Sequence, residues 1–281
     1  MKEITVNWHI IEKCNYKCDY CFAKYAKSEG KEVHHSKSQI DTVLQKIYDF
    51  FSQKYIGYEI RLNIAGGEPF LAKNFEYIIR KAFEIGFNIS IITNGSKITN
   101  SFIEKNAKYI SMFAISIDSL SNDINKKIGR VSGKYCLRPS TILQSIEKLR
   151  HSNPAIKIKI NTVVNRHNYM QYLGDFIDLI NPNKWKVLQA VSLCDETYCT
   201  DKNYRKFLKN HANIKSNIYQ ESNTDMEDSY IMLDPYARFY QNTNKRYVYS
   251  ESLIMTCVPD AFETIKFDYD KFQRRYHEDC C

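Results

Sequence analysis

The chain has 281 residues, of which 43% are hydrophobic and 14% aromatic, with nine cysteines and a formal net charge of +8. This is enough for one large α/β domain or two small ones. No apolar run is long enough to cross a bilayer, and the first residues begin a strand pattern, which excludes a signal peptide. We therefore expect a cytoplasmic protein whose cysteines are reduced and used in metal or redox chemistry, not in disulfides.

The positive charge favours an anionic partner. The lysines form no single long block, and the densest run, "KNYRKFLKNH", is typical of a solvated helix face. A generally basic surface or a small phosphorylated ligand explains the charge as well as a nucleic acid does. We expect no stable nucleic-acid complex.

Short β-rich runs alternate with amphipathic runs through the first two thirds of the chain. The expected strands are residues 4–10, 59–65, 88–93, 110–117, 156–164 and 185–191. Apolar residues at a 3–4 spacing predict helices around 40–51, 75–83 and 142–149, and Gly86 is a stop signal for the second. About six strand–helix–strand repeats predict a parallel sheet with crossover helices.

After about residue 195 this alternation ends. Residues 203–214 have a helical pattern, 229–241 read as strand, turn and strand, and the last 30 residues look polar and irregular. We expect residues 1–195 to form a barrel core and 196–281 to form a C-terminal extension that packs on it and closes the site.

Four short motifs follow the first four expected strands. The cysteine-rich "EKCNYKCDYC" follows the first strand, "GGEP" the second and "NGS" the third, while "SIDS" ends the fourth. In parallel α/β sheets, chemistry sits at the carboxyl ends of the strands. We expect the functional residues to cluster there.

The cysteine motif holds Cys14, Cys18 and Cys21 on one expected loop. Thiolates are soft ligands that select zinc or iron–sulfur clusters. A structural zinc site uses four protein ligands, commonly in two separate pairs, so three cysteines on one loop fit zinc poorly. They fit a four-iron cluster with one iron open to a non-protein ligand. Zinc completed by a distant histidine or cysteine is the competing interpretation.

The spacing CxxxCxxC, with an aromatic residue before the last cysteine, resembles the signature of the radical S-adenosylmethionine superfamily. This resemblance implies a partial (βα)6 TIM-like barrel and a [4Fe–4S] cluster, whose open iron binds S-adenosylmethionine and whose reduction yields a 5′-deoxyadenosyl radical. It places Arg130 on the cofactor carboxylate and Asn94 beside the ribose. The full set of implied cofactor-binding residues is Tyr20, Phe22, Gly66, Gly67, Glu68, Asn94, Ser116 and Arg130.

Further segments, "KINTVVN", "WKVLQ" and "SYIMLDPYARF", resemble the viperin family in order and spacing. The resemblance implies a prokaryotic member without the amphipathic membrane helix of the animal proteins. The implied reaction removes the 4′-hydrogen of a ribonucleoside triphosphate and expels the 3′-hydroxyl as water. The 3′-deoxy-3′,4′-didehydro product would terminate viral or phage nucleic-acid chains. The base (CTP, UTP or GTP) is left open.

A triphosphate carries about four negative charges, so its site needs several cations and hydrogen-bond donors. Lys159 and Asn161 alternate along one expected strand, as do Lys184 and Lys186 along another, so each pair shares a face. Inward lysines are costly without an anion, whereas Lys157 reads as solvated. The expected substrate-binding residues are Asn7, His9, Arg61, Asn63, Ala65, Lys159, Asn161, Lys184, Lys186, Tyr236 and Arg238.

Loss of water requires an acid near the leaving hydroxyl, and Lys159 is the candidate. Tyr236 could supply the final proton or electron, or could close the pocket, and the two roles are exchangeable. His9 fits the site or, equally, a satisfied core position. The resemblance also implies an external one-electron donor of the flavodoxin or ferredoxin type, and we expect a monomer.

The chain departs from the family pattern at several points. Ala65 stands where eukaryotic relatives have serine, and Lys184 where arginine is common. About eleven extra residues, 27–37, precede the second strand, and we expect His34 and His35 within them to be exposed loop residues. Cys280 and Cys281 have no role in the family.

Two alternatives remain. One is a radical reaction on another substrate such as a peptide, although Cys194, Cys199 and Cys257 are too few and irregular to suggest an auxiliary cluster. The other is a cluster- or zinc-bearing nucleic-acid-binding protein, which leaves "GGEP" unexplained.

Overall fold

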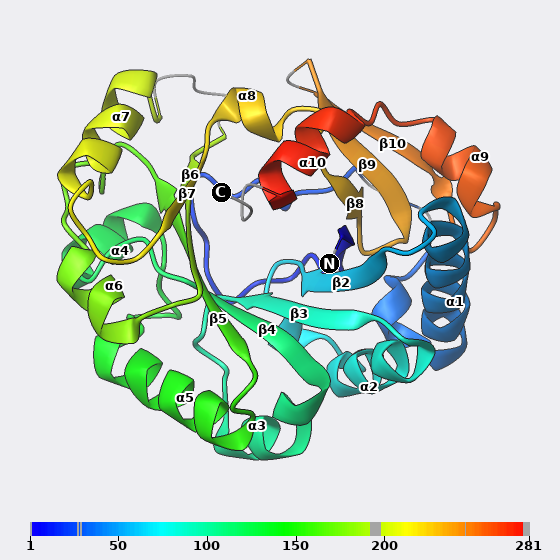
Figure 1. Cartoon of the computed structure of the whole chain (residues 1–281), viewed down its shortest axis with the longest axis horizontal. Coiled ribbons are helices and arrows are strands. Elements are labelled where there is room, and N and C mark those ends of the chain that lie inside the picture. The colour runs from blue at the N-terminus through cyan, green and yellow to red at the C-terminus, as the bar shows by residue number, and fades with distance from the viewer. Residues whose placement is uncertain (1, 27, 29, 192–197, 245, 278–281) are drawn as a thin grey trace. The chain divides into compact units, whose positions relative to one another are not determined.

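The computed structural model describes residues 2–26, 28, 30–191, 198–244 and 246–277 (Figure 1). These residues form two compact units. The first comprises the described parts of Met1–Lys13, Tyr25–Ile92 and Asp225–Cys281, and the second comprises those of Cys14–Lys24 and Thr93–Thr224.

The first unit is built on strands in the order β10-β9-β8-β1-β2-β3. β1 is parallel to both β2 and β8, β2 is parallel to β3, and the β8–β9 and β9–β10 pairs are antiparallel. The strands are β1 (Glu3–His9), β2 (Glu59–Ala65), β3 (Asn88–Thr93), β8 (Ile231–Leu233), β9 (Arg238–Thr243) and β10 (Arg246–Ser252). The helices are η1 (Val33–His35), α1 (Lys37–Lys54), η2 (Pro69–Leu71), α2 (Phe75–Ile85), α9 (Val258–Glu263) and α10 (Tyr269–His277).

Two amphipathic helices, α1 and α2, lie side by side in this unit (Figure 1). α1 begins where the Ser36 hydroxyl accepts the Gln39 N–H, which satisfies one unpaired donor of the first turn. α2 ends at Gly86, whose φ of 118° suits glycine. Each helix buries one apolar stripe: Ile40, Val43, Leu44, Ile47 and Phe51 on α1, and Phe75, Ile78, Ile79 and Ala82 on α2.

The strand β1 has an apolar face and a polar face, and both are buried. Ile4, Val6 and Trp8 are fully inaccessible, while Thr5, Asn7 and His9 on the opposite face are at most 7% exposed. Buried polar groups must find partners inside the protein or in a ligand, so each side chain of this polar face needs such a partner.

The second unit has a parallel sheet in the order β4-β5-β6-β7. Its strands are β4 (Ile110–Ser116), β5 (Lys157–Val164), β6 (Lys184–Gln189) and β7 (Ile218–Glu221). Its helices are α3 (Asn100–Asn106), η3 (Ala107–Tyr109), α4 (Asn122–Ile128), α5 (Pro139–Ser152), α6 (Gly174–Ile180) and α7 (Asp201–Asn210); the short α8 (Asn223–Met226) follows β7. α3 and α5 pack side by side (Figure 1).

The parallel strands and the main helices match the sequence-based expectations closely. Within 229–241, the expected strand, turn and strand correspond to β8, the turn that follows it and the start of β9. The expectation that the last 30 residues are irregular is wrong: they contain α9 and α10. Their polar composition hides the helices because only a few apolar anchors, such as the fully buried Phe272, face the interior.

Among the described residues, no helix has both the length and the hydrophobicity of a membrane-spanning segment.

Candidate active site

The cysteine loop lies in the second unit and is irregular. Cys14, Cys18 and Cys21 are half-buried free thiols, and the Tyr16 N–H and the Asn94 side-chain amide lie 3.4 and 3.8 Å from the Cys14 sulfur. Burial raises the pKa of the Cys18 thiol to about 12, so this thiol is protonated until a metal displaces its proton. Three thiols on one loop, with N–H donors aimed at a sulfur, fit a four-iron cluster.

The loop is held in place by the end of α4. The Lys17 N–H donates to the Gly129 carbonyl at 3.0 Å, and the Asp19 N–H donates to the Ile128 carbonyl at 3.1 Å. A Cβ on residue 129 would stand 2.1 Å from the Lys17 carbonyl oxygen, and φ there is 85°. Only glycine permits both this backbone conformation and this close packing.

A buried network joins the loop to the end of β4. The Tyr20 hydroxyl donates to Asp118, and Arg130 donates to the Tyr20 oxygen at 3.0 Å and to the Ser116 carbonyl at 2.6 Å. The Arg130 guanidinium also pairs with the Asp118 carboxylate at 3.4 Å. Burial raises the pKa of Tyr20, so its phenol stays protonated and can donate. The network fixes Arg130 while leaving other guanidinium N–H groups for a carboxylate.

The expected ribose contact, Asn94, is buried beside the same loop. Its side-chain N–H donates to the Asn15 side-chain oxygen at 2.9 Å, and its own oxygen accepts the Ser96 N–H at 2.9 Å. Phe22, the last expected cofactor contact on this loop, is 39% exposed. Four of the cofactor candidates (Tyr20, Asn94, Ser116 and Arg130) are thus brought together around the cysteine loop.

The "GGEP" motif lies in the first unit, directly after β2. The Gly67 N–H donates to the Ile11 carbonyl at 2.7 Å, and the Glu68 N–H donates to the Lys13 carbonyl at 3.0 Å. A Cβ on Gly67 would stand 2.3 Å from the Glu12 oxygen. The close approach that needs glycine here is therefore to the backbone of residues 11–13, which lead into the cysteine loop.

A row of hydrogen-bonded side chains crosses β1, β2 and β3 in the first unit. The Asn63 amide donates to the Asn7 oxygen at 2.7 Å, the Ser90 hydroxyl donates to the Asn63 oxygen at 2.8 Å, and Asn7 donates to the Ile231 carbonyl at 3.2 Å. Arg61, two residues before Asn63 on β2, forms an ion pair with Glu3 through two nitrogen–oxygen contacts of 2.6 and 2.7 Å. Arg61 thus has a carboxylate partner that its sequence context did not suggest.

His9 lies at the end of β1, in register with the buried Ala65. Its Nδ1 is 2.5 Å from the Tyr25 hydroxyl and 3.2 Å from the Tyr240 hydroxyl. Burial lowers the pKa of His9 to about 4, so the ring is neutral at physiological pH. The two phenol hydroxyls therefore surround Nδ1 of a neutral ring.

This buried histidine predicts acid-sensitive stability. The unfolded chain binds a proton near pH 6.5 and the folded chain only near pH 4, so stability falls as the pH drops through this interval. The loss attributable to His9 is on the order of 3 kcal/mol. Urea unfolding at pH 7 and pH 4.5 measures it, and His9→Gln should remove most of this part of the pH dependence. An unchanged pH profile in His9→Gln would contradict the assignment.

Tyr236 lies in the turn between β8 and β9, and Arg238 begins β9. Asp234, fully buried, accepts the Tyr236 N–H at 2.9 Å and pairs with the Arg238 guanidinium at 2.6 Å. Arg238 also donates to the Ala26 carbonyl at 2.7 Å. Burial, reinforced by Glu32 and Glu12, raises the pKa of Tyr236, so it is a neutral phenol with a proton to give.

The lysines expected to bind phosphate lie on the second unit's sheet. Lys159 is in register with Lys184, and Asn161 is in register with both Ser116 and Lys186. Lys186 is 8% exposed and pairs with the buried Glu221 at 2.5 Å, while the Lys184 ammonium stands 3.8 Å from the Tyr219 ring centre. Asn161 is 7% exposed, and its side-chain oxygen has no hydrogen-bond partner within the described part of the chain. Lys157, on the same strand, is exposed as expected.

Sequence reasoning missed two acidic residues. Asp118 lies inside the quoted "SIDS" motif and organises Arg130 and Tyr20, and Glu221 holds Lys186. Asp118 closely follows the apolar run of β4, and its place at the carboxyl end of a strand is the signal that could have found it, whereas the polar segment around Glu221 offers no such signal. Cys194, Cys280 and Cys281 lie outside the described residues.

Comparisons with known proteins show the family to which the chain is similar. The family model described as "Radical SAM superfamily" matches residues 8–180. A protein of Psychrobacter lutiphocae named S-adenosylmethionine-dependent nucleotide dehydratase is 38% identical over 98% of this chain and 95% of its own length. A protein of the same name from a Fibrobacter species is 35% identical over 98% of this chain and 89% of its own length.

Among solved structures, native anSMEcpe with bound AdoMet and a peptide superposes with a TM-score of 0.70 at 16% identity, covering 96% of this chain and 84% of its own. At this identity the likeness shows the fold alone. It confirms the expected α/β partial-barrel fold.

Proposed function

Because the chain belongs to the radical SAM superfamily and, within it, to the viperin family of S-adenosylmethionine-dependent nucleotide dehydratases, we propose that it dehydrates a ribonucleoside triphosphate. The reaction removes the 4′-hydrogen and the 3′-hydroxyl and gives a 3′-deoxy-3′,4′-didehydronucleotide. The observation that carries this substrate is the row of Lys159, Asn161, Lys184 and Lys186 on neighbouring strands.

Bound [4Fe–4S] cluster and S-adenosylmethionine supply a 5′-deoxyadenosyl radical that abstracts hydrogen. Cys14, Cys18 and Cys21 would hold the cluster. Arg130 is fixed by Asp118 and Tyr20, so its guanidinium can bind the cofactor carboxylate without losing side-chain entropy on binding. Asn94 would contact the ribose, and Phe22, Gly66, Gly67, Glu68 and Ser116 would complete the cofactor site.

The second unit supplies cations that suit a triphosphate. A buried ammonium is stable only with an anion nearby, and Glu221 fills that role for Lys186 in the ligand-free protein. The side-chain oxygen of Asn161, which has no hydrogen-bond partner among the described residues, favours a ligand that brings a donor, such as a ribose hydroxyl. Further substrate contacts would come from Asn7, His9, Arg61, Asn63, Ala65 and Arg238.

We assign proton transfer to two groups. Lys159, half-buried on β5, would protonate the departing 3′-hydroxyl, since an ammonium beside phosphate remains charged. Tyr236 would supply a later proton or electron, because its raised pKa keeps the phenol protonated. The segment 196–281 would close the nucleotide pocket.

Lys186→Ala should raise the KM for the nucleotide triphosphate at least about tenfold, because it removes one charge-assisted phosphate contact and leaves Glu221 buried without its partner. Lys157→Ala removes an exposed lysine from the neighbouring strand and should leave KM unchanged. Isothermal titration calorimetry with the triphosphate and with the bare nucleoside separates the affinity due to the phosphates from the affinity due to the nucleoside. Equal triphosphate affinity in Lys186→Ala and wild type would remove Lys186 from the site.

The reaction setting follows from its chemistry. Three thiolate ligands must stay reduced, so we place the protein in the cytoplasm as a monomer served by a flavodoxin- or ferredoxin-type donor. A nucleotide without a 3′-hydroxyl stops polymerases, and we infer an antiviral role against phage.

The test is anaerobic reconstitution followed by incubation with reductant, S-adenosylmethionine and each of CTP, UTP, GTP and ATP separately. Mass spectrometry should find 5′-deoxyadenosine together with one nucleotide lighter by one water. If no nucleotide raises 5′-deoxyadenosine above the nucleotide-free control, the proposed function is wrong.

A further inference from the structure

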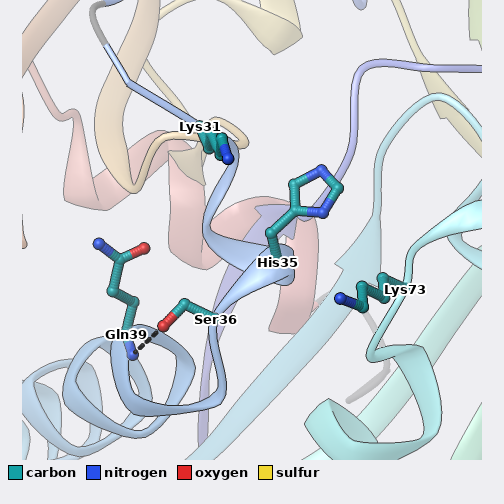
Figure 2. Close-up of a pocket in the computed structure, with 5 residues that line it drawn as sticks. All are labelled: Lys31, His35, Ser36, Gln39 and Lys73. Atoms are coloured by element: carbon teal, nitrogen blue, oxygen red, sulfur yellow. Dashed lines mark hydrogen bonds between the residues drawn. The ribbon is translucent and has the colours of Figure 1, made fainter.

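A basic hollow opens on the surface of the first unit. It has a volume of about 680 Å³ and is lined by Lys31, His35, Ser36, Gln39 and Lys73 (Figure 2). Lys31, His35 and Lys73 are exposed, and none of the five lining residues is acidic. The first turn of α1, capped by Ser36, adds the positive end of an 18-residue helix.

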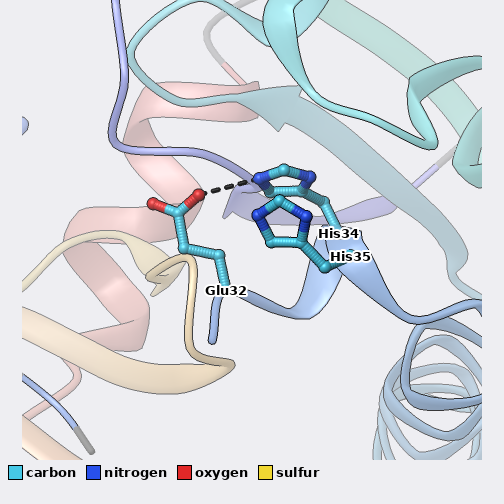
Figure 3. Close-up of side chains that lie close together, drawn as sticks. All are labelled: Glu32, His34 and His35. Carbon is cyan, nitrogen blue, oxygen red and sulfur yellow. Dashed lines mark hydrogen bonds and ion pairs between the residues drawn. The ribbon is translucent and has the colours of Figure 1, made fainter. Parts of the chain in front are cut away.

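Hydrogen bonds of His34 and Glu32 hold the wall of this hollow in place. Contrary to the expectation of an exposed loop, His34 is only 2% exposed. Its Nε2 lies 2.8 Å from the Glu32 carboxylate (Figure 3). Its Nδ1 accepts the Lys73 N–H at 3.1 Å. Its carbonyl accepts the Asn74 amide at 2.9 Å. These bonds fix the backbone positions of both the His35 and the Lys73 side of the hollow.

The same side chains do not form a metal site. Ligand atoms of Glu32, His34 and His35 lie within 4.8 Å of one another. However, an imidazole whose Nδ1 accepts a hydrogen bond carries its proton on Nε2, so His34 has no lone pair to offer next to Glu32. The cluster is therefore a structural brace.

The brace also ties the hollow to the chain that enters the cysteine loop. Glu32 accepts the backbone N–H of Glu12 at 2.9 Å. Glu12 precedes Cys14 by two residues in the sequence, so the hollow is bonded to the stretch that runs directly into the first cluster ligand.

We propose that this hollow, with Lys31, His35 and Lys73, is the docking surface for a small acidic one-electron donor protein of the flavodoxin or ferredoxin class. The inference rests on the proposed function, in which each turnover would draw electrons from outside: one for the cluster that cleaves S-adenosylmethionine and a second to reduce the substrate radical. Docking would transfer one electron: the donor is oxidised by one electron, the cluster is reduced by one, and no bond forms or breaks.

The arrangement fits a protein face better than a small anion. Its two cations, Lys31 and Lys73, are exposed on an open hollow, whereas a small-anion site would need them to converge with buried donors. Spread positive charge steers a negatively charged partner over several ångströms and orients it on arrival.

The test is charge reversal in the full-length, cluster-loaded protein. The double variant Lys31→Glu/Lys73→Glu is compared with Lys105→Glu/Lys148→Glu, which makes the same charge change at exposed positions on α3 and α5. Anaerobic stopped-flow absorbance follows cluster reduction by reduced flavodoxin at low ionic strength, and by dithionite. No nucleotide is present.

Flavodoxin should reduce the Lys31→Glu/Lys73→Glu cluster at least about tenfold more slowly than wild type, with a weaker salt dependence. Dithionite should reduce both at the same rate, and the control variant should resemble wild type with either reductant. Equal flavodoxin rates in the two double variants would overturn the docking surface. A second result would also overturn it: inorganic phosphate slowing reduction of the wild-type cluster by flavodoxin more than sodium chloride of equal ionic strength does. That result would indicate a small-anion site.

The proposed function fails separately. A wild-type protein that holds no dithionite-reducible cluster would overturn the dehydratase assignment and this surface with it. A reducible cluster without nucleotide turnover would overturn the substrate while leaving the docking result valid.

Discussion

Replacing Cys18 by alanine is expected to abolish both cluster binding and nucleotide-dependent formation of 5′-deoxyadenosine. The loop offers three thiols, and a cluster left with two protein ligands is not retained through purification. Iron and acid-labile sulfide analysis, with the visible absorption of the reconstituted protein, measures the loss.

Cys136→Ala is the matched control for this variant. Cys136 is a half-buried free cysteine of the same unit, outside the motif, and its removal should leave the iron content at four per chain, as in wild type. If Cys18→Ala retains four irons while Cys136→Ala loses them, the motif has been misassigned.

Gly129→Ala is expected to destabilise the protein strongly and to weaken cluster retention. The new methyl group would meet the Lys17 carbonyl at 2.1 Å, and the residue would remain at a φ of 85°. Backbone strain and overpacking together cost about 2–4 kcal/mol. The Lys17–Gly129 hydrogen bond would break as the cysteine loop moved away. Urea unfolding of the apoprotein and iron content after reconstitution measure the two effects.

Gly133→Ala separates the clash from the backbone strain. Gly133 also has a positive φ, 61°, but nothing lies within 4 Å of the added Cβ. This control should lose only about 1 kcal/mol and keep its cluster. Equal destabilisation in the two variants would show that the contact with the cysteine loop contributes nothing.

The architecture of the parallel strands was predictable because their local pattern is unambiguous. Ile4, Val6 and Trp8 alternate with Thr5, Asn7 and His9, and the structure buries both faces of this strand. Strand periodicity fixes which residues share a face, and the motifs at the strand ends then follow from the parallel topology. The same logic placed Lys159 and Asn161 on one face of their strand, while the register of Asn161 with Lys186 is a finding of the structure.

Partners distant in sequence were not predictable. The ion pair of Arg61 with Glu3 depends on the register between β1 and β2, and that of Lys186 with Glu221 depends on β6 pairing with β7. A single sequence states neither register. These pairs matter for the proposed substrate. To bind phosphate, Arg61 and Lys186 must either leave the carboxylates of Glu3 and Glu221 or bind carboxylate and phosphate together.

Local composition misled at two places. His34 lies in a run of lysines, serines and glycine that is typical of an exposed loop. The side chain is nevertheless buried, and it forms hydrogen bonds with Lys73 and Glu32. The polar C-terminal stretch forms α9 and α10 around a few aromatic anchors. In both cases tertiary contacts outweighed the local propensity.

The most direct test of the central claim follows one hydrogen atom. The reconstituted protein is given S-adenosylmethionine, reductant and the accepted nucleotide triphosphate carrying deuterium at the 4′ carbon. Mass spectrometry should find one deuterium in the 5′-deoxyadenosine and none in the nucleotide product, which should be lighter than the labelled substrate by one deuterium and one hydroxyl group. Unlabelled 5′-deoxyadenosine, or an amount equal to that formed without nucleotide, would contradict the account.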